Sequence, residues 1–387
     1  MHIIRGLRNC LARLGWLVVL LALFFLFTGP IKVLAEPYVT ADAAIVIDGE
    51  TGKVLYGKNI HQRRAPASTT KILTTILGIE LGNLEDIVKA SRNAAYTGGS
   101  SMYLKVGEEL TLEEILFGVM LSSGNDASVA VAEHLAGNVE KFAELMNHKA
   151  KEIGALNSTF QNPHGLPNDK HLTTAYDLAM IMRYGMQNDM FRKLTATKYQ
   201  SVKGPDESWQ IRSLRNHNKL LWKMTDCDGG KTGYTRAAGR CLISTATRKG
   251  RRVIAVVLHA DLLWQDSIKL LDYGLDNFKN VTLYDEGQEI ESLNIPESKE
   301  KELSLITPRE FVMTFPNNAE PKVERKIRLA EEIYLPIPKG QKLGVMEVIV
   351  DGENVGQLDL VAGSDVTEMS FVQKFWRWFS SILKTFT

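Results

Sequence analysis

The hydrophobic pattern of the chain changes near residue 280, and this change limits the folds available to its 387 residues. Before that point, strand-like apolar runs alternate with segments of helical periodicity. This predicts an α/β (α+β) domain with an antiparallel sheet and a helical cluster. After it, short apolar runs are separated by Pro, Gly and charged residues. That pattern predicts a small all-β sandwich domain.

The first domain is expected to open with a hairpin and to close with three strands and a helix. Residues 43–47 and 53–56 form the expected hairpin. Helices are expected from residue 68 onward, within 112–135 with a break at 122–125, over 174–184 and over 267–278. Strands are expected over 229–235, 240–247 and 252–259, and in the second domain over 311–315, 327–329, 333–335 and 345–350.

Residues 1–35 have the pattern of a secretory signal peptide. Three arginines precede a nearly continuous apolar run over 15–28, and Val33 and Ala35 precede the expected cleavage site. An uncleaved transmembrane anchor is the alternative, although the run is short for a span of about 20 residues. We therefore expect an exported protein, with its first domain over 36–279 and its β-domain over 280–363.

Residues 364–387 predict an amphipathic helix that binds a membrane surface. An aromatic face opposite a basic face is typical of an interfacial anchor, and the segment is too polar to span a bilayer. We expect it to hold the protein at the outer face of the cytoplasmic membrane; docking on protein is the alternative. The apolar face carries Phe371, Phe375, Trp378, Phe379, Ile382, Leu383 and Phe386, and the polar face Gln373, Lys374, Arg377, Ser380 and Lys384.

Charge and cysteine content narrow the class of protein further. The formal net charge of +1 argues against a nucleic-acid-binding protein, which usually carries a marked basic excess. Cys10 lies in the predicted signal peptide, whereas Cys227 and Cys241 would meet an oxidising compartment. These two could form a disulfide or remain small buried hydrophobic residues. The sequence does not indicate an oligomeric state.

Ser68 and Lys71 form the first of three short motifs with chemically active side chains. They stand one turn apart at the start of an expected helix, so their side chains share a face. The first turn has free backbone amides that favour developing negative charge. A buried lysine near other cations has a lowered pKa and can act as a general base. The pair can therefore serve as nucleophile and base without a histidine.

The other two motifs supply groups that can hold a substrate. Ser123 and Asn125 flank a glycine at the break in the helical region, where a hydroxyl and an amide can relay a proton and bind a substrate amide. In the expected strand, Lys231 can bind a carboxylate with Thr232 in support, and Gly233 lets an extended ligand approach the backbone. Each motif alone also fits an ordinary loop or strand, so the combination carries the argument.

The order Ser-x-x-Lys, Ser-x-Asn, Lys-Thr-Gly resembles the signature of the penicillin-binding protein and serine β-lactamase superfamily. The flanking strings resemble, more narrowly, the low-molecular-weight D-alanyl-D-alanine carboxypeptidases. That family also has a C-terminal β-domain and a terminal amphipathic anchor, so the resemblance extends from signal peptide to tail. The strings are TGKVLY at 51–56, PASTTK at 66–71, NPHGLP at 162–167 and DGGKTGYT at 228–235.

The resemblance implies a serine-type carboxypeptidase that removes the terminal D-alanine from peptidoglycan stem peptides through an acyl-enzyme, with β-lactams as covalent inhibitors. Ser68 would be the nucleophile and Lys71 its base. Ser123 and Asn125 would relay protons and hold the substrate backbone. The remaining implied contacts are Lys231 and Thr232 to the terminal carboxylate, Gly233 beside the ligand, and the amides of Ser68 and Tyr234 as the oxyanion hole.

Three alternatives stay open at this point. A β-lactamase would need a Glu-x-x-Leu-Asn loop, and the nearest string, 152–157, is one residue too long. An endopeptidase or transpeptidase would share the same acyl-enzyme. A non-catalytic wall-binding scaffold would have no need of the motif residues. The scattered histidines lack metal-binding spacing, so neither a metal nor another cofactor is expected, and His164 is expected to be a turn residue near the cleft.

Overall fold

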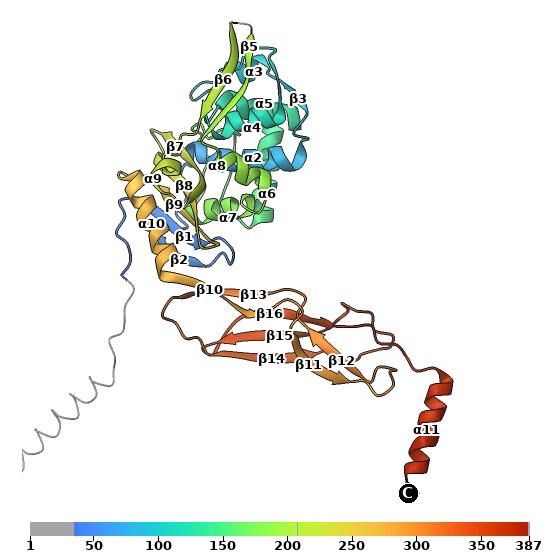
Figure 1. The fold of residues 1–387 in the computed structure, drawn as a ribbon. Helices are drawn as coiled ribbons and strands as arrows, with labels where there is room; N and C mark the ends of the chain where they lie inside the picture. Colours follow the sequence, from blue (N-terminus) through green and yellow to red (C-terminus); the bar gives the residue numbers. More distant parts are fainter. Residues whose placement is uncertain (1–34, 207, 386–387) are drawn as a thin grey trace, which may run out of the picture. The chain divides into compact units, whose positions relative to one another are not determined.

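The structure is a computed structural model that describes residues 35–206 and 208–385 (Figure 1). The predicted signal peptide, apart from Ala35, lies outside the described residues, as does Phe386 of the predicted anchor.

A five-stranded antiparallel sheet with the order β2-β1-β9-β8-β7 organises the first domain. Every residue of β1 is buried, so both faces of the sheet are covered. On one face, Ile45 and Ile47 join a core that includes the helices; on the other, Val46 packs beside Gly274 of helix α10. The strands are β1 (Ala43–Asp48), β2 (Val54–Lys58), β7 (Cys227–Thr235), β8 (Gly239–Arg248) and β9 (Arg251–Leu258).

The helices begin at residues whose side chains cap them. Thr111 and Glu114 form a reciprocal capping box at the start of α4, and Thr174 accepts the Asp177 amide at the start of α7. The helical elements are the 3₁₀ turn η1 (Ala67–Thr70), α2 (Lys71–Leu81), α3 (Arg92–Ala95), α4 (Leu112–Met120), α5 (Asn125–Ala136), α6 (Val139–Ile153), α7 (Ala175–Gly185), α8 (Asp189–Ala196), α9 (Leu220–Lys223) and α10 (Leu263–Asn277).

These elements confirm the predicted α/β fold and correct it in detail. Ser68 lies in the 3₁₀ turn that precedes α2, not in the first turn of an α-helix. Helix α10 starts four residues before the expected residue 267. The sequence interpretation also missed two hairpins, β3–β4 (Ile87–Lys89, Glu109–Thr111) and β5–β6 (Tyr199–Asp206, Trp209–Arg215).

The C-terminal β-domain contains two antiparallel sheets that contribute to one core. Tyr284 of β10 and Phe315 of β13 share this core with Leu305 and Leu360 from the larger sheet. The small sheet pairs β10 (Phe278–Tyr284) with β13 (Phe311–Pro316). The larger one has the order β11-β12-β16-β15-β14, with bounds Glu289–Asn294, Glu302–Ile306, Glu353–Ala362, Lys342–Val350 and Val323–Leu329.

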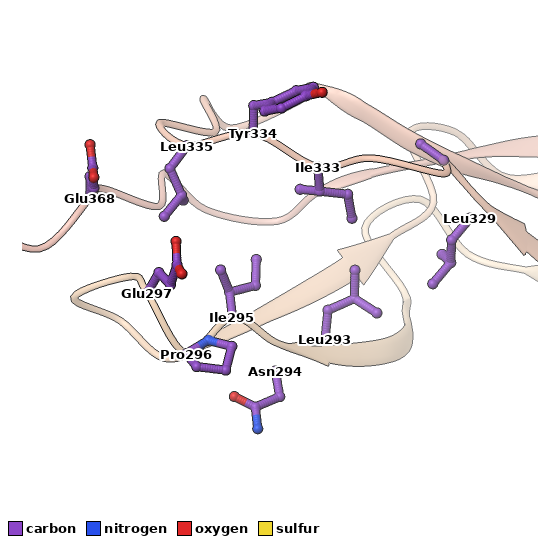
Figure 2. A pocket seen from close by; sticks show the side chains of 11 residues that line it. Leu293, Asn294, Ile295, Pro296, Glu297, Leu329, Ile333, Tyr334, Leu335 and Glu368 are labelled. Atoms are coloured by element: carbon purple, nitrogen blue, oxygen red, sulfur yellow. The ribbon is translucent and has the colours of Figure 1, made fainter.

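The prediction of a strand over 333–335 is wrong. These residues form a loop, and their apolar side chains line a pocket of about 590 Å³ together with the end of β11 (Figure 2). Glu297 and Glu368 stand at this pocket. An apolar run thus arose from a loop that covers a surface cavity and not from sheet pairing.

Helix α11 (Phe371–Thr385) confirms the predicted terminal helix. Phe371, Phe375 and Phe379 are exposed, as the predicted apolar face requires, and Trp376 is exposed as well. Lys374 forms an ion pair with Glu368. Among the described residues, no helix has both the length and the apolar character that a membrane span requires.

Cys227 and Cys241 are both buried free thiols. Cys241 pairs with Gly233 across β7 and β8, whereas Cys227 pairs with Ala246. The two cysteines therefore lie at different positions along the β7–β8 ladder and are not opposite each other. Of the two alternatives from the sequence, a disulfide or small buried hydrophobic residues, the structure shows the second.

One buried ion pair links the missed β5–β6 hairpin to the turn before β4. The Arg212 and Glu108 side chains are 2% and 5% exposed, and their charged groups lie 2.9 Å apart. Arg212 also donates to the carbonyl oxygens of Tyr103 and Lys203. We predict that Arg212→Ala lowers the free energy of unfolding by about 3–5 kcal/mol, because Glu108 keeps a buried, unpaired charge.

Urea denaturation followed by circular dichroism would measure this loss. The control is Lys105→Ala, which removes the exposed ion pair with Asp206 on the same hairpin and should change stability little. Equal stability of the two variants would show that the Arg212 pair does not hold the hairpin.

Candidate active site

Lys71 is the centre of the candidate site because its side chain is fully buried and its amine meets three oxygen atoms. Its Nζ lies 3.1 Å from Ser68 Oγ, 2.7 Å from Asn125 Oδ1 and 2.7 Å from the His164 carbonyl oxygen. The structure therefore brings Ser68, Lys71 and Asn125 of the first two motifs into one hydrogen-bonded group.

The contacts of Lys71 fit an uncharged amine. Asn125 Nδ2 donates to the Gly98 carbonyl, which turns Asn125 Oδ1 toward Lys71 as an acceptor. That oxygen and the His164 carbonyl take the two N–H groups of a neutral amine. The nitrogen lone pair is then left for the hydroxyl proton of Ser68, so this geometry suits a general base.

The electrostatic surroundings also favour the uncharged form of Lys71. Burial lowers the pKa of Lys71 well below its usual value, and the charge of Lys231 lowers it further. The Asp126 carboxylate acts in the opposite direction. Burial is the largest of the three effects, so the net shift of the pKa is downward.

Ser123 and Lys231 form a second group at the site. Lys231 Nζ donates to Ser123 Oγ at 2.9 Å and to the Thr232 carbonyl at 3.1 Å. A protonated amine keeps a third N–H for a ligand. Burial lowers the pKa of Lys231 to about 7. Ser123 thus contacts the strand lysine, and its left-handed φ of 57° marks a strained turn that fixes its side chain.

Strand β7 places the third motif directly beside Ser68. It pairs only with β8 in the described sheet, so no strand pairs with its other edge, where Thr195 and Asn218 bond to the Gly229–Gly230 backbone and Gly233 faces η1. A Cβ atom on Gly233 would lie 2.9 Å from the Ser68 amide nitrogen, so this approach requires glycine. Tyr234 follows at the same edge with its side chain 69% exposed, and Thr232 is partly exposed.

The loop over residues 162–167 closes the opposite side of the Ser68 turn. Its Pro163 carbonyl accepts from Thr74 Oγ1 at 2.6 Å, next to the His164 carbonyl that Lys71 contacts. Gly165 has a φ of +87°, and a Cβ atom there would lie 1.8 Å from the Ala67 carbonyl oxygen. Glycine at 165 is therefore needed for the loop to reach Lys71.

The histidine side chains near this loop are structural. The Gln161 amide donates to His171 Nδ1, so His171 Nε2 carries the proton and donates to Thr70 Oγ1 at 2.9 Å. Burial lowers the pKa of His171 to about 4 and that of His164 to about 3. His164 contributes its carbonyl oxygen, in keeping with its predicted place in a turn by the cleft.

Asp126 is a site residue that the sequence interpretation missed. Its buried carboxylate accepts hydrogen bonds from Ser101 Oγ and from the amides of Met102, Leu104 and Ala127. It thereby fastens the 101–104 loop to the start of α5, beside Asn125. Its position directly after the Ser-Gly-Asn motif, as an acidic residue in the first turn of a helix, was the available signal.

The string that bears on the β-lactamase alternative lies elsewhere. Glu152 is in the last turn of α6, where its side chain is exposed, forms an ion pair with Lys149 and contacts His148 Nδ1 at 3.2 Å. Its carboxylate is committed to these surface partners. Residues 152–157 therefore resemble the water-activating loop of class A β-lactamases in sequence but not in structure.

A partly exposed serine against a buried lysine, beside the edge strand of this sheet, defines a penicillin-binding-protein-like domain, followed here by a β-domain. The D-alanyl-D-alanine carboxypeptidase family matches residues 31–262, and the C-terminal domain of penicillin-binding protein 5 matches residues 278–368. The chain belongs to the D-alanyl-D-alanine carboxypeptidase family.

Individual relatives agree over most of their length. The chain is 35% identical to the D-alanyl-D-alanine carboxypeptidase DacF of Bacillus subtilis (strain 168), over 86% of this chain and 87% of that protein. It is 32% identical to DacC of Escherichia coli (strain K12), over 93% and 96%. The crystal structure of penicillin binding protein 5 from Haemophilus influenzae superposes with a TM-score of 0.74 at 28% identity, covering 87% of this chain and 100% of that one.

Proposed function

We propose that the protein is a serine-type D-alanyl-D-alanine carboxypeptidase that removes the terminal D-alanine from peptidoglycan stem peptides. The observation that carries this proposal is the contact between Ser68 and the buried amine of Lys71, beside an open strand edge that carries Lys231. Family membership supports the same reaction. β-Lactams would acylate Ser68, because they offer a strained amide and a matching carboxylate.

In the proposed reaction, Lys71 takes the hydroxyl proton as Ser68 Oγ attacks the carbonyl carbon of the penultimate D-alanine. The amides of Ser68 and Tyr234 stabilise the oxyanion. The amide bond breaks, the leaving D-alanine amine gains a proton, and water then hydrolyses the ester. Ser123 and Asn125 assist proton transfer and hold the substrate backbone.

Recognition of the substrate chain end falls to strand β7. Lys231 and Thr232 would bind the terminal carboxylate, and the substrate would lie along the open edge past Gly233 as an added strand. The lowered pKa of Lys231, about 7, reflects an ammonium group buried without a carboxylate partner. A bound carboxylate supplies that partner and favours the charged form.

The alternative functions would need different residues at the site. The exposed Glu152 argues against a class A β-lactamase mechanism. Transpeptidation and endopeptidase activity use the same acyl-enzyme, so the Ser68 geometry is compatible with both. A non-catalytic scaffold would gain nothing from burying Lys71 at the serine.

We also propose the cellular setting and domain limits. The signal peptide over 1–35 would export the chain, the catalytic domain would span 36–279, and the β-domain 280–363. The segment 364–387 would attach the enzyme to the outer face of the membrane. The exposed phenylalanines of α11 and the basic Lys374 support this attachment.

Replacing the nucleophile tests the proposed function most simply. We predict that Ser68→Ala lowers the rate of D-alanine release from a pentapeptide by about 10³-fold or more and abolishes labelling by fluorescent penicillin. Ser201→Ala, which changes an exposed serine on β5, serves as the control. Release of D-alanine by a folded Ser68→Ala protein at the rate of the control would refute the assignment.

The pH dependence of acylation tests the role of Lys71. Acylation needs the uncharged amine, so its rate should rise with pH through the lowered pKa of Lys71 and then level off. Because the Lys231 charge lowers that pKa, Lys231→Met should raise it and move the rising limb to higher pH.

Stopped-flow measurement of penicillin acylation from acidic to alkaline pH would locate the rising limb. Lys269→Met, on the exposed side of α10, should leave the limb in place. If the rising limb of the pH–rate profile were unchanged or moved to lower pH in Lys231→Met, the proposed effect of the Lys231 charge on the pKa of Lys71 would be contradicted.

Removal of the terminal helix tests the membrane proposal. We predict that a mature protein ending at residue 365 remains in the supernatant with anionic vesicles while the full mature chain sediments. A full-length Phe375→Ser, Phe379→Ser variant keeps the basic residues and should bind vesicles at least about tenfold more weakly, because burial of apolar area drives interfacial binding. Sedimentation of the truncated protein would show that the attachment lies elsewhere.

A further inference from the structure

An exposed cluster of two aromatic rings and an arginine stands on the β5–β6 hairpin. Tyr199 and Arg215 face each other in the strand register, and Trp222 follows in α9. The Arg215 guanidinium lies 5.8 Å from the Tyr199 ring centroid and 5.5 Å from that of Trp222. The two rings meet edge to face at 5.6 Å. These contacts hold the arginine in place while leaving it exposed.

The cluster has an unbalanced positive charge. Among the described residues, no carboxylate forms an ion pair with Arg215, and Lys198 Nζ lies 6.0 Å from the Trp222 centroid. The stretch 208–225 contains no Asp or Glu, and of its four basic residues only Arg212 has a carboxylate partner, Glu108, among the described residues. A planar guanidinium that is fixed by stacking and lacks a carboxylate is suited to bind one from a ligand.

The chain runs from this cluster directly to the candidate site. Asn216 and Asn218 are buried, and Asn218 Nδ2 donates to the Gly229 carbonyl on β7, two residues before Lys231. His217 lies between them, and its pKa is lowered to about 4 by partial burial and then by the charges of Lys231, Arg215 and Lys71. The cluster therefore lies beyond the Gly229 end of β7.

The proposed roles of the β7 residues indicate which part of the substrate would lie near the Gly229 end of the strand. Tyr234 would contact the carbonyl oxygen under attack, while Lys231 and Thr232 would hold the carboxylate on the other side of the scissile bond. The leaving group therefore points along β7 toward lower residue numbers, where Asn218 is attached. A leaving group larger than one alanine would continue toward Arg215.

We propose that Tyr199, Arg215 and Trp222 form a subsite for a carboxylate-bearing peptide leaving group, so that the enzyme also cleaves cross-links between stem peptides. This inference rests on the proposed function. A single D-alanine has one carboxylate, which Lys231 and Thr232 engage. A cross-linked stem peptide carries further carboxylates, one of which would pair with Arg215 while apolar atoms of the peptide cover the rings.

The chemistry of this reaction matches that of D-alanine release. Ser68 Oγ forms an ester with the donor D-alanine carbonyl, and the amide bond to the side-chain amine of the second peptide breaks. That amine takes up a proton and leaves. Water hydrolyses the ester, which restores the serine hydroxyl and gives a carboxylate, so no further reactant is needed.

The experiment compares two substrates with each enzyme: a monomeric pentapeptide and a purified cross-linked dimeric muropeptide. Product formation, followed by liquid chromatography, gives kcat/KM for each. We expect the wild type to cleave both. Arg215→Ala should lower the dimer-to-pentapeptide ratio of kcat/KM by about tenfold, the effect of losing one charge-assisted contact.

Two variants sharpen the test. Arg215→Lys keeps the charge but loses the stacked, bidentate geometry, so its ratio should fall between those of the wild type and Arg215→Ala. Lys269→Ala removes an exposed positive charge from α10 and should leave the ratio unchanged. Stoichiometric penicillin labelling of every variant shows that the acylation site is intact.

The outcomes separate this inference from the proposed function. A wild type that releases D-alanine but does not cleave the dimer overturns the subsite and leaves the carboxypeptidase proposal in place. An unchanged ratio in Arg215→Ala also overturns it. If neither substrate is cleaved, the proposed function fails, and the subsite fails with it.

Discussion

The burial of the Lys71 amine against Ser68 is the interaction on which the site depends. Water would keep a lysine charged, and a charged amine cannot accept the serine proton. Here burial and the neighbouring Lys231 charge lower the pKa of Lys71, while Asn125 Oδ1 and the His164 carbonyl occupy its two hydrogens. Its Nζ lies 3.1 Å from Ser68 Oγ, so the lone pair of an uncharged amine would face the hydroxyl. The fold thus gives Ser68 and Lys71 the contacts that the proposed nucleophile and base require.

Several neighbouring contacts hold the buried Lys71 amine against Ser68. Asp126 fastens the 101–104 loop over the start of α5, and Gly165 lets the 162–167 loop reach Lys71 where any Cβ atom would collide with Ala67. Gly233 brings β7 against the Ser68 amide on the remaining side. Ala67, next to Ser68, and Ser123 itself both have left-handed φ angles. Such strain persists only where neighbouring contacts fix the backbone.

The sequence predicted the parts of this arrangement that depend on side-chain identity. Periodicity located the central strands and the helix expected over 174–184, and three spaced motifs named the residues that meet at the site. The sequence could not predict the contact of Lys71 with the His164 carbonyl, because every residue type has the same backbone carbonyl group. The β5–β6 hairpin was not predicted because Gly204 and Pro205 interrupt the alternation of apolar and polar residues in β5. Its buried residue Arg212 is also of a type that usually lies at the surface. The apolar run at 333–335 was wrongly predicted to be a strand, because apolar residues are typical both of pocket linings and of β-strands.

A direct titration of Lys71 tests whether its amine loses its charge as easily as a general base requires. Selective ¹⁵N labelling of lysine, with Lys71→Arg used to assign the signal, would follow the protonation of its Nζ by NMR in the free enzyme. We predict a pKa of Lys71 well below the ordinary lysine value of 10.5. A Lys71 that stays protonated up to that value would contradict it, because the serine would then have no base at the pH of the cell.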